Sequence, residues 1–312
     1  MANEVSTFMT NGMSNIKESV GDAIYTISPT DTVFMNLVKK GKATSVKEEW
    51  LEDSDRTPGV NAKAEEWTGS ASAVTQPVRK YNYTQIFADR VDITDSMESA
   101  AKYGRVSEIE RLIEKGLRQI SKDAEYAFIN NSAAPSAHVS GTGGKLKGAL
   151  GFVTTNTYNF GGTTTNACDL TEPLFQDGIQ AAWSSGGNPS VVLAPPAVAR
   201  TISGFVGNGR LSQNVEASKK TVIQAVDFYQ SQFGMVKVHT SRWMEPKDVS
   251  TVKYDYMLIL EPEKWEIAWL KKTKVERQAK QGLVTPVVIS AEATLKCYNE
   301  AANFKMENIS RV

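Results

Sequence analysis

The glycine-rich stretch GTGGKLKG, residues 141–148, is the first candidate for chemistry because such stretches often bind phosphate. A P-loop needs a glycine five positions before its Gly-Lys pair and a serine or threonine after the lysine. Neither Gly41-Lys42 nor Gly144-Lys145 meets this requirement. The dinucleotide-binding spacing also fails, because Leu146 stands where the third glycine should be. We therefore interpret the stretch as a flexible turn.

Histidine and cysteine, which bind zinc or act as nucleophiles in many enzymes, are scarce. The two histidines are His138 and His239, and the two cysteines are Cys168 and Cys297. A zinc site needs three or four clustered ligands, and these residues are not paired at ligand spacing. The chain also has no G-x-S-x-G or H-E-x-x-H motif. We expect no catalytic residue, no metal site and no cofactor, although carboxylates that meet only on folding stay open as a catalytic pair.

Two charged segments remain as candidates for a binding surface. Residues 44–70 hold seven acidic and three basic residues and two copies of Glu-Glu-Trp, whereas residues 264–280 hold six basic and two acidic residues. Tryptophan favours burial and anchors many interfaces. The alternative for the basic segment is the solvated face of a strand. We therefore treat the two segments as a candidate docking surface, with these candidate contact residues: Glu48, Glu49, Trp50, Glu65, Glu66, Trp67, Lys271, Lys272 and Lys274.

Hydrophobic periodicity predicts the elements that carry these segments. Residues 106–130 have an apolar stripe behind a Ser107-x-x-Glu110 capping box, which predicts a long helix. Residues 79–93 alternate and predict a strand of about 50 Å, too long to stay within the body of a domain. A closing strand is predicted at 287–297. Further helices are expected at 16–24, 28–41, 95–103, 171–185 and 196–206, a loop at 131–168, and strands at 190–194, 221–229, 235–239, 254–260 and 265–270.

Composition limits the class of protein. The 312 residues are 41% hydrophobic and 22% charged, which is typical of a folded chain with a real core. Thirty-five basic and thirty-five acidic residues cancel, which argues against a dedicated nucleic-acid binder. No apolar run has the length of a membrane span, and the cysteine content suits a reducing compartment. We expect a soluble protein made in the cytosol.

The order of the segments resembles the major capsid protein of tailed bacteriophages, which has the Hong Kong 97-type fold. The resemblance covers the chain from about residue 20, and none of its motifs is catalytic. It rests on SPTDTVFMNL, the paired Glu-Glu-Trp loop, YNYTQIFADRVDIT, GTGGKLKGALGFV after the long helix, and the closing AEATLKCYNEAANFKMENI.

The resemblance implies an α+β fold and a structural role without enzymatic activity. The chain would be a subunit of an icosahedral bacteriophage capsid that self-assembles into hexamers and pentamers and encloses the genome. Its extended loop would lie across a neighbouring copy, where Trp50 and Trp67 would be buried and the acidic segment 44–70 would meet the basic segment 264–280. The implied parts are an N-terminal arm (1–43), an extended loop formed by a long β-hairpin (44–93), a peripheral domain with the spine helix and the glycine-rich loop (94–169), an axial α/β domain (170–282), and a C-terminal strand that returns to the peripheral domain (283–312).

The resemblance also implies partners. These are further copies of the chain, a portal protein, decoration proteins, packaged DNA held only non-specifically, and a separate scaffolding protein, since the long internal scaffold of some relatives is missing here. No membrane is implied. The subunit would be made and assembled in the host cytoplasm and reside in the virion. Two alternatives stay open: the shell protein of an encapsulin-type bacterial nanocompartment, and an α/β enzyme or ligand-binding protein with a projecting arm.

Overall fold

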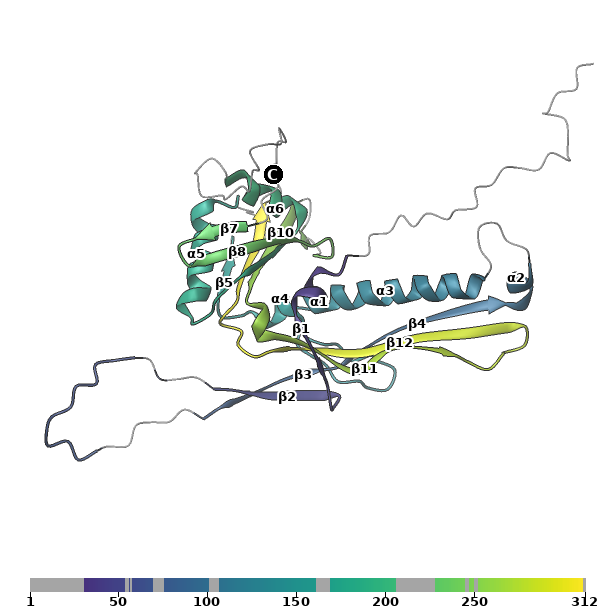
Figure 1. Cartoon of the computed structure of the whole chain (residues 1–312), viewed down its shortest axis with the longest axis horizontal. Helices are drawn as coiled ribbons and strands as arrows, with labels where there is room; N and C mark the ends of the chain where they lie inside the picture. Colours follow the sequence, from purple (N-terminus) through teal and green to yellow (C-terminus); the bar gives the residue numbers. More distant parts are fainter. Residues whose placement is uncertain are drawn as a thin grey trace, which may run out of the picture.

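The computed structural model describes residues 31–53, 56, 58–69, 76–100, 107–160, 169–205, 228–244, 247–249 and 252–310. The helix expected at 16–24 and most of the strand expected at 221–229 lie outside these residues. The described residues form two large β-sheets and a two-stranded hairpin that projects from the body of the molecule (Figure 1).

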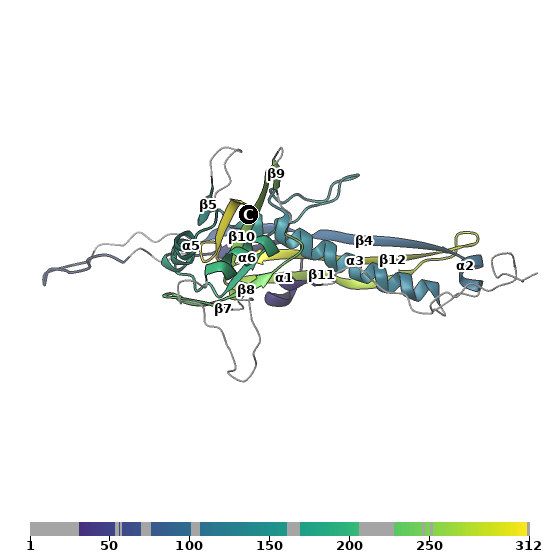
Figure 2. The ribbon, with the colours of Figure 1, turned by 90° about the horizontal axis from the view of Figure 1, so that it is seen from above.

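A four-stranded sheet forms the elongated part of the molecule. Its order is β1 (Lys39–Lys42), β11 (Trp265–Arg277), β12 (Val284–Cys297) and β4 (Gln85–Thr94). Helix α3 (Glu108–Asn130) runs along one face of this sheet, as Figures 1 and 2 show from two directions. The length follows from the strands, because the 14 residues of β12 span about 46 Å at about 3.3 Å each.

The predicted long helix is confirmed, beginning at Glu108. Ser107 caps it, because its side chain accepts a hydrogen bond from the backbone N–H of Glu110 at 3.3 Å. The apolar stripe is buried in its C-terminal half, at Ile120, Ala124 and Phe128, and the Phe128 ring packs on Phe87 of the sheet with centroids 6.1 Å apart. The capping residue and the stripe are both local features, which is why sequence alone predicts this element well.

Gly116, in the middle of α3, has a packing reason. A Cβ atom added there would lie 2.5 Å from Cδ1 of Ile289 on β12. Glycine costs up to about 1 kcal/mol in a helix interior relative to alanine, so close packing of the helix on the sheet offsets a local cost.

A seven-stranded sheet forms the second part. Its order is β5 (Thr157–Asn159), β13 (Phe304–Ser310), β10 (Val252–Leu260), β6 (Val191–Ala194), β8 (Gly234–Thr240) and β7 (Phe228–Ser231), and β9 (Lys247–Val249) also pairs with β10. Helices α5 (Glu172–Ser184) and α6 (Pro196–Ser203) pack on it, with Phe175, Ile179 and Ile202 buried in its core. The helices predicted at 171–185 and 196–206 and the strands predicted at 190–194, 235–239 and 254–260 are confirmed.

The long strand predicted at 79–93 is two strands. β3 (Val78–Tyr83) pairs with β2 (Lys47–Glu52) in the projecting hairpin, whereas β4 pairs along its whole length with β12. Thr84 separates them, and its hydroxyl donates a 2.7 Å hydrogen bond to buried Glu292. The prediction that the whole strand leaves the body is therefore wrong for β4. The part that leaves is the β2–β3 hairpin with its loop (Figure 1).

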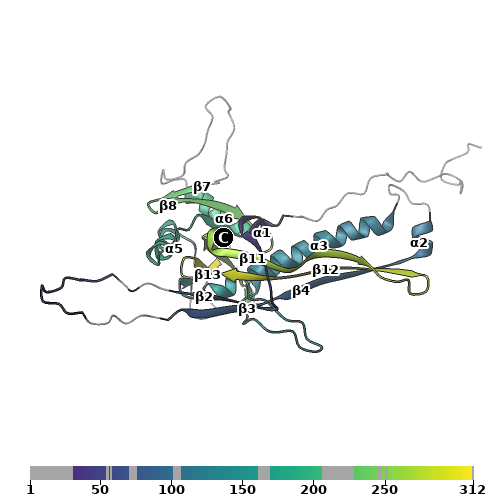
Figure 3. The same ribbon diagram turned by 60° about the horizontal axis from the view of Figure 1, so that its bottom comes forward.

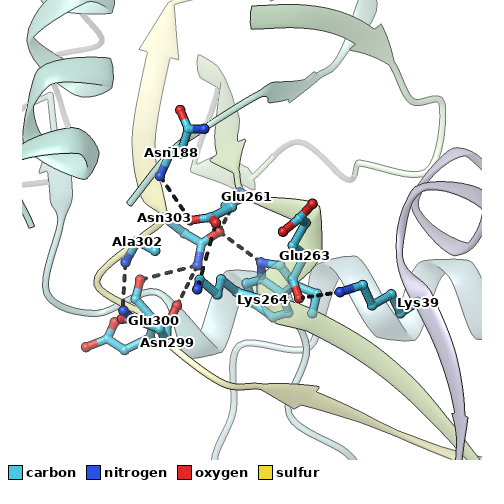
Figure 4. A network of polar contacts seen from close by, with 10 residues as sticks. Lys39, Asn188, Glu261, Glu263, Lys264, Asn299, Glu300, Ala302 and Asn303 are labelled. Atoms are coloured by element: carbon cyan, nitrogen blue, oxygen red, sulfur yellow. Dashed lines mark hydrogen bonds and ion pairs between the residues drawn. The ribbon is translucent and has the colours of Figure 1, made fainter. Parts of the chain in front are cut away.

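After α3 and α4 have led from β4 to β5, the chain passes twice more between the two sheets, and one asparagine holds both of these later passages. The first runs through the 3₁₀ turn Pro262–Lys264 into β11, and the second links β12 to β13. The side-chain oxygen of Asn303 accepts the backbone N–H of Glu261 at 3.0 Å (Figure 4). It also accepts the indole N–H of Trp265 at 2.9 Å. The closing strand predicted at 287–297 is confirmed as β12, but residues 283–312 also hold β13, which belongs to the other sheet.

Other local predictions change for tertiary reasons. The helix expected at 28–41 is described only as α1 (Val33–Leu37), because Lys39–Lys42 instead pair in parallel with β11 as strand β1. The helix expected at 95–103 is α2 (Asp95–Ser99), and the loop expected at 131–168 contains α4 (Ala149–Phe152) and β5. Within the described ranges, no helix is both long and apolar enough to span a bilayer.

Candidate intersubunit surfaces

The first Glu-Glu-Trp copy lies at the root of the hairpin, and its tryptophan is buried. Trp50 is only 9% exposed, and its indole N–H donates a hydrogen bond to the carbonyl oxygen of Cys297 at 2.9 Å. Its ring also packs on Phe152, with centroids 6.1 Å apart. The prediction that Trp50 finds its burial on another copy is therefore wrong. This indole fastens the hairpin to its own body.

Glu48 belongs to the same attachment. Its carboxylate is 7% exposed and lies 2.9 Å from the ammonium group of Lys296 on β12. It also accepts the backbone N–H groups of Thr44 and Ser45. Burial opposes ionisation, but the hydrogen bonds from Lys296, Thr44 and Ser45 outweigh it and lower the pKa of Glu48 to about 2. Because this carboxylate is already paired and buried, it is not part of an exposed acidic surface.

Glu49, the other acidic residue at the root, is paired on the hairpin itself. Its oxygens lie 2.5 Å from the ammonium group of Lys47 and 3.2 Å from the guanidinium group of Arg79. Much of the acidic charge that the sequence gathers near residue 48 is thus neutralised within the hairpin.

The second Glu-Glu-Trp copy lies in the loop between β2 and β3, and its three side chains are exposed, unlike the buried Glu48 and Trp50 of the first copy. Trp67 is 54% exposed. The ammonium group of Lys63 lies over its ring, 5.3 Å from the ring centroid. Glu65 and Glu66 are exposed and form no ion pair within the described parts of the chain. In Figures 1 and 3 the segment 58–69 lies at the end of the molecule farthest from α3. The predicted contact role of Glu65, Glu66 and Trp67 stays a prediction.

The basic residues of β11 divide in the same way. Lys271 lies 3.5 Å from buried Glu292, and Lys274 lies 2.7 Å from Glu276. Lys272 forms no ion pair among the residues that the structure places. Instead it borders a groove of about 650 Å³ together with Lys40 and Lys42, two lysines of β1 that sequence reasoning missed. The pairing of β1 with β11, which brings them together, has no local sequence pattern that would predict it.

A second hollow, the root cavity, lies where the hairpin joins the body. Its volume is about 330 Å³. Trp50, Tyr81, Phe152 and Pro135 give it apolar walls, and Arg79 and Lys147 are among its charged residues. The Lys147 ammonium group lies 5.1 Å from the Phe152 ring centroid, and burial lowers the pKa of Lys147. The hairpin therefore carries an exposed tryptophan at one end and a cavity with aromatic walls at the other.

The histidine and cysteine considered above as possible ligands or nucleophiles, His138 and Cys297, make structural contacts instead. His138 Nδ1 accepts the backbone N–H of Gly144 at 3.0 Å, which fixes the glycine-rich turn. Cys297 is buried, and burial raises the pKa of its thiol, so it is not an activated nucleophile. In the described part of the chain, no three His, Cys, Asp or Glu side chains lie together as a metal site would require. Cys168 lies outside that part.

Comparison of the sequence with models of protein families shows the family to which the chain belongs. The model of the SU10 major capsid protein family matches residues 3–310. The chain belongs to the SU10 major capsid protein family. This membership confirms the predicted function, a structural subunit of a bacteriophage capsid, and it implies a structural rather than an enzymatic role.

Individual relatives agree with the family. The major capsid protein of Escherichia phage Phieco32 is 28% identical over 134 residues, which are 43% of this chain and 38% of that relative. The aligned part thus spans well under half of the relative's length. Among solved structures, the cyanophage A-1(L) capsid subunit has a TM-score of 0.69 at 12% identity, covering 94% of this chain and 97% of that one.

A second solved structure bears on the alternative. The SrpI encapsulin of Synechococcus elongatus has a TM-score of 0.60 at 12% identity, covering 96% of this chain and 94% of that one. At such low identity the likenesses show the fold alone. They confirm the α+β capsid fold, with its Hong Kong 97-type architecture, that the sequence resemblance implied.

Proposed function

We propose that this member of the SU10 major capsid protein family forms the wall of an icosahedral phage capsid as hexamers and pentamers, with its hairpin lying on a neighbouring copy. One observation carries the proposal. The hairpin displays exposed apolar side chains on a segment that extends away from both cores, where only another molecule can cover them. These side chains are Leu51, Val60, Trp67 and Val78.

We assign the parts of the fold to that role with revised boundaries. The extended loop is residues 44–83, since β4 pairs in the body. The peripheral domain consists of the four-stranded sheet with α3, and the axial domain consists of the seven-stranded sheet with α5 and α6. The N-terminal arm reaches to about residue 43, where β1 has joined the sheet.

The remaining partners are proposals that rest on membership of the capsid protein family. They are a separate scaffolding protein, a portal protein and decoration proteins, with assembly in the host cytoplasm and residence in the virion. Packaged DNA would be held only non-specifically, since equal numbers of acidic and basic residues leave no net attraction for phosphate.

The encapsulin likeness favours a second candidate, a nanocompartment shell. Both candidates are closed shells, so assembly alone does not separate them. The contents do: a capsid is filled with DNA through a portal, whereas a nanocompartment encloses a cargo protein.

The test is assembly of the full chain, produced alone and together with a scaffolding protein. Sedimentation and electron microscopy are expected to reveal closed particles of megadalton size. A chain that stays monomeric in both conditions would contradict the shell. Particles that copurify with one stoichiometric cargo protein, and lack DNA when isolated from infected cells, would support the nanocompartment.

A further inference from the structure

We propose that the root cavity of one copy receives Trp67 from the hairpin loop of the next copy, so that a single repeated contact links the copies head to tail. This rests on the proposed function, because it specifies where the hairpin lies on its neighbour. The proposal concerns the partner of the loop, whereas the existence of a shell is the subject of the preceding experiment.

The loop offers the chemistry of an anchor. Trp67 keeps about half of its surface exposed, and its backbone N–H is fixed by the carbonyl oxygen of Ala64 at 3.0 Å. Two exposed carboxylates, Glu65 and Glu66, precede it in the chain. An aromatic ring flanked by negative charge fits a site with apolar walls and a cationic rim.

The root cavity offers the complementary chemistry. Aromatic side chains from three places in the sequence, Trp50, Tyr81 and Phe152, line it. At about 330 Å³ it is open to solvent and of the size that accommodates a large side chain. Its polar rim includes Lys147, whose ammonium group forms no ion pair within the described ranges, and Arg79.

Other charges at the rim are already used. Glu300 accepts the backbone N–H of Thr154 at 2.9 Å, and Glu52 lies 3.5 Å from Lys80. Lys147 is therefore a rim cation that forms no ion pair within the described chain, and Glu300 of the same rim interacts with it only through its charge. A carboxylate from the loop of another copy would give Lys147 an ion pair.

The fold prevents a copy from filling its own cavity. β2 and β3 pair over six residues on each strand and lead away from the root, so the loop lies at the opposite end of the hairpin (Figures 1 and 3). Trp67 and the root cavity thus lie at opposite ends of the hairpin. Such a heterologous contact generates a closed ring when the rotation between copies closes, and an open chain when it does not.

The basic groove beside β1 is the competing site for the same loop. It has Lys40, Lys42 and Lys272 and an apolar floor that includes Trp269. The root cavity is preferred because three aromatic residues line its smaller volume of about 330 Å³, whereas the groove of about 650 Å³ has one aromatic residue. The test below treats the groove as the outcome that overturns the proposal.

The first experiment is chemical crosslinking in assembled particles. Glu66→Cys is combined with Ala134→Cys at the cavity rim, and a short bismaleimide is added. A ladder from dimer up to pentamer and hexamer on a denaturing gel is expected, because each copy links to the next. The matched control pairs Glu66→Cys with Val139→Cys, an exposed position outside the cavity, and should give no ladder. A ladder with Lys40→Cys in place of Ala134→Cys would overturn the proposal in favour of the groove.

The second experiment uses assembly-deficient variants. Trp67→Ala and the cavity-filling Ala134→Phe are each expected to lower the yield of closed particles at least tenfold while the thermal melt of the subunit is unchanged. Mixing the two variants gives one working loop and one working cavity per pair, so only one-to-one dimers are expected. Normal particles from either variant, when wild-type shells form in parallel, would refute the contact. Failure of the wild-type chain itself to form shells would instead refute the proposed function.

Discussion

The indole N–H of Trp50 and the carbonyl oxygen of Cys297 are joined by a 2.9 Å hydrogen bond across 247 positions of sequence. The bond connects the base of the projecting hairpin to the end of the longest strand of the body. It makes the direction of the hairpin a property of the folded subunit rather than of a free loop.

Trp50→Ala is expected to destabilise the subunit by about 3–5 kcal/mol, since it empties a buried site and leaves the Cys297 carbonyl group without its donor. Urea unfolding followed by tryptophan fluorescence and circular dichroism measures the change. Trp67→Ala is the matched control and should alter the free energy of unfolding by no more than about 0.5 kcal/mol. Equal losses in the two variants would contradict the difference in their burial.

The raised pKa of Glu125 on α3 leads us to expect that the free energy of unfolding of the subunit falls as pH rises. Its buried carboxylate accepts the backbone N–H groups of Phe34 at 2.6 Å and Met35 at 2.9 Å, and burial raises the pKa of Glu125 to about 7. A raised pKa gives stability that is complete below the unfolded value of 4.5 and is lost as pH rises through about 7. The expected loss is about 3 kcal/mol at about 1.4 kcal/mol per pKa unit.

Glu125→Gln tests this assignment, because the amide oxygen still accepts an N–H group but does not ionise. Urea midpoints of the variant between pH 5 and pH 8, compared with those of the unchanged chain, should lack this decline. A decline of the same size in the variant would assign the effect to other groups.

The lowered pKa of Glu48 leads us to expect the opposite pH dependence of the free energy of unfolding. The lowered pKa of Glu48 contributes stability above the unfolded value of 4.5 that is lost as pH falls towards about 2. Lys296→Met leaves the carboxylate buried without its cation and should cost about 3–5 kcal/mol at pH 7. The difference between the variant and the unchanged chain should shrink below pH 4, as measured by chemical denaturation. A difference independent of pH would indicate that Lys296 acts through its packing alone.

Asn303→Ala should weaken the connection between the two sheets. It removes the acceptor for the backbone N–H of Glu261 and the indole N–H of Trp265, and each buried donor left unpaired costs about 1–3 kcal/mol. A loss of at least about 2 kcal/mol in unfolding free energy is expected. Asn188→Ala serves as the control, since its side chain is exposed and only its backbone N–H bonds to Glu261. Limited proteolysis should cleave the Asn303 variant faster near the passages between the sheets.

The elements that sequence predicts well are those whose cause is local. Helix α3 follows from one capping serine and a repeating apolar stripe, and both lie within its own residues. The break at Thr84 could not be predicted in that way. Alternation continues across it, while the pairing strand changes from β2 to β12, a choice made by residues about two hundred positions away.

The two tryptophans make the same point for the candidate site. Each follows Glu-Glu, and nothing in that tripeptide separates a buried anchor from an exposed one. Trp50 is buried because β12 and α4 present Cys297 and Phe152 to it, whereas the described residues of the loop bring no such partner to Trp67. Local pattern finds the residues, and long-range contacts decide their roles.

The pairing of β4 with β12 also has a consequence for the order of synthesis. A ribosome releases the hairpin and β4 long before it makes residues 284–297, so β4 and Trp50 wait without their partners while most of the chain is translated. Contacts of this sequence separation fold slowly and leave strand edges and apolar surface open to aggregation in the meantime. The hairpin cannot take its fixed direction until the last strands arrive. A half-made chain therefore lacks the geometry to join a neighbour, and assembly competence is reserved for finished molecules.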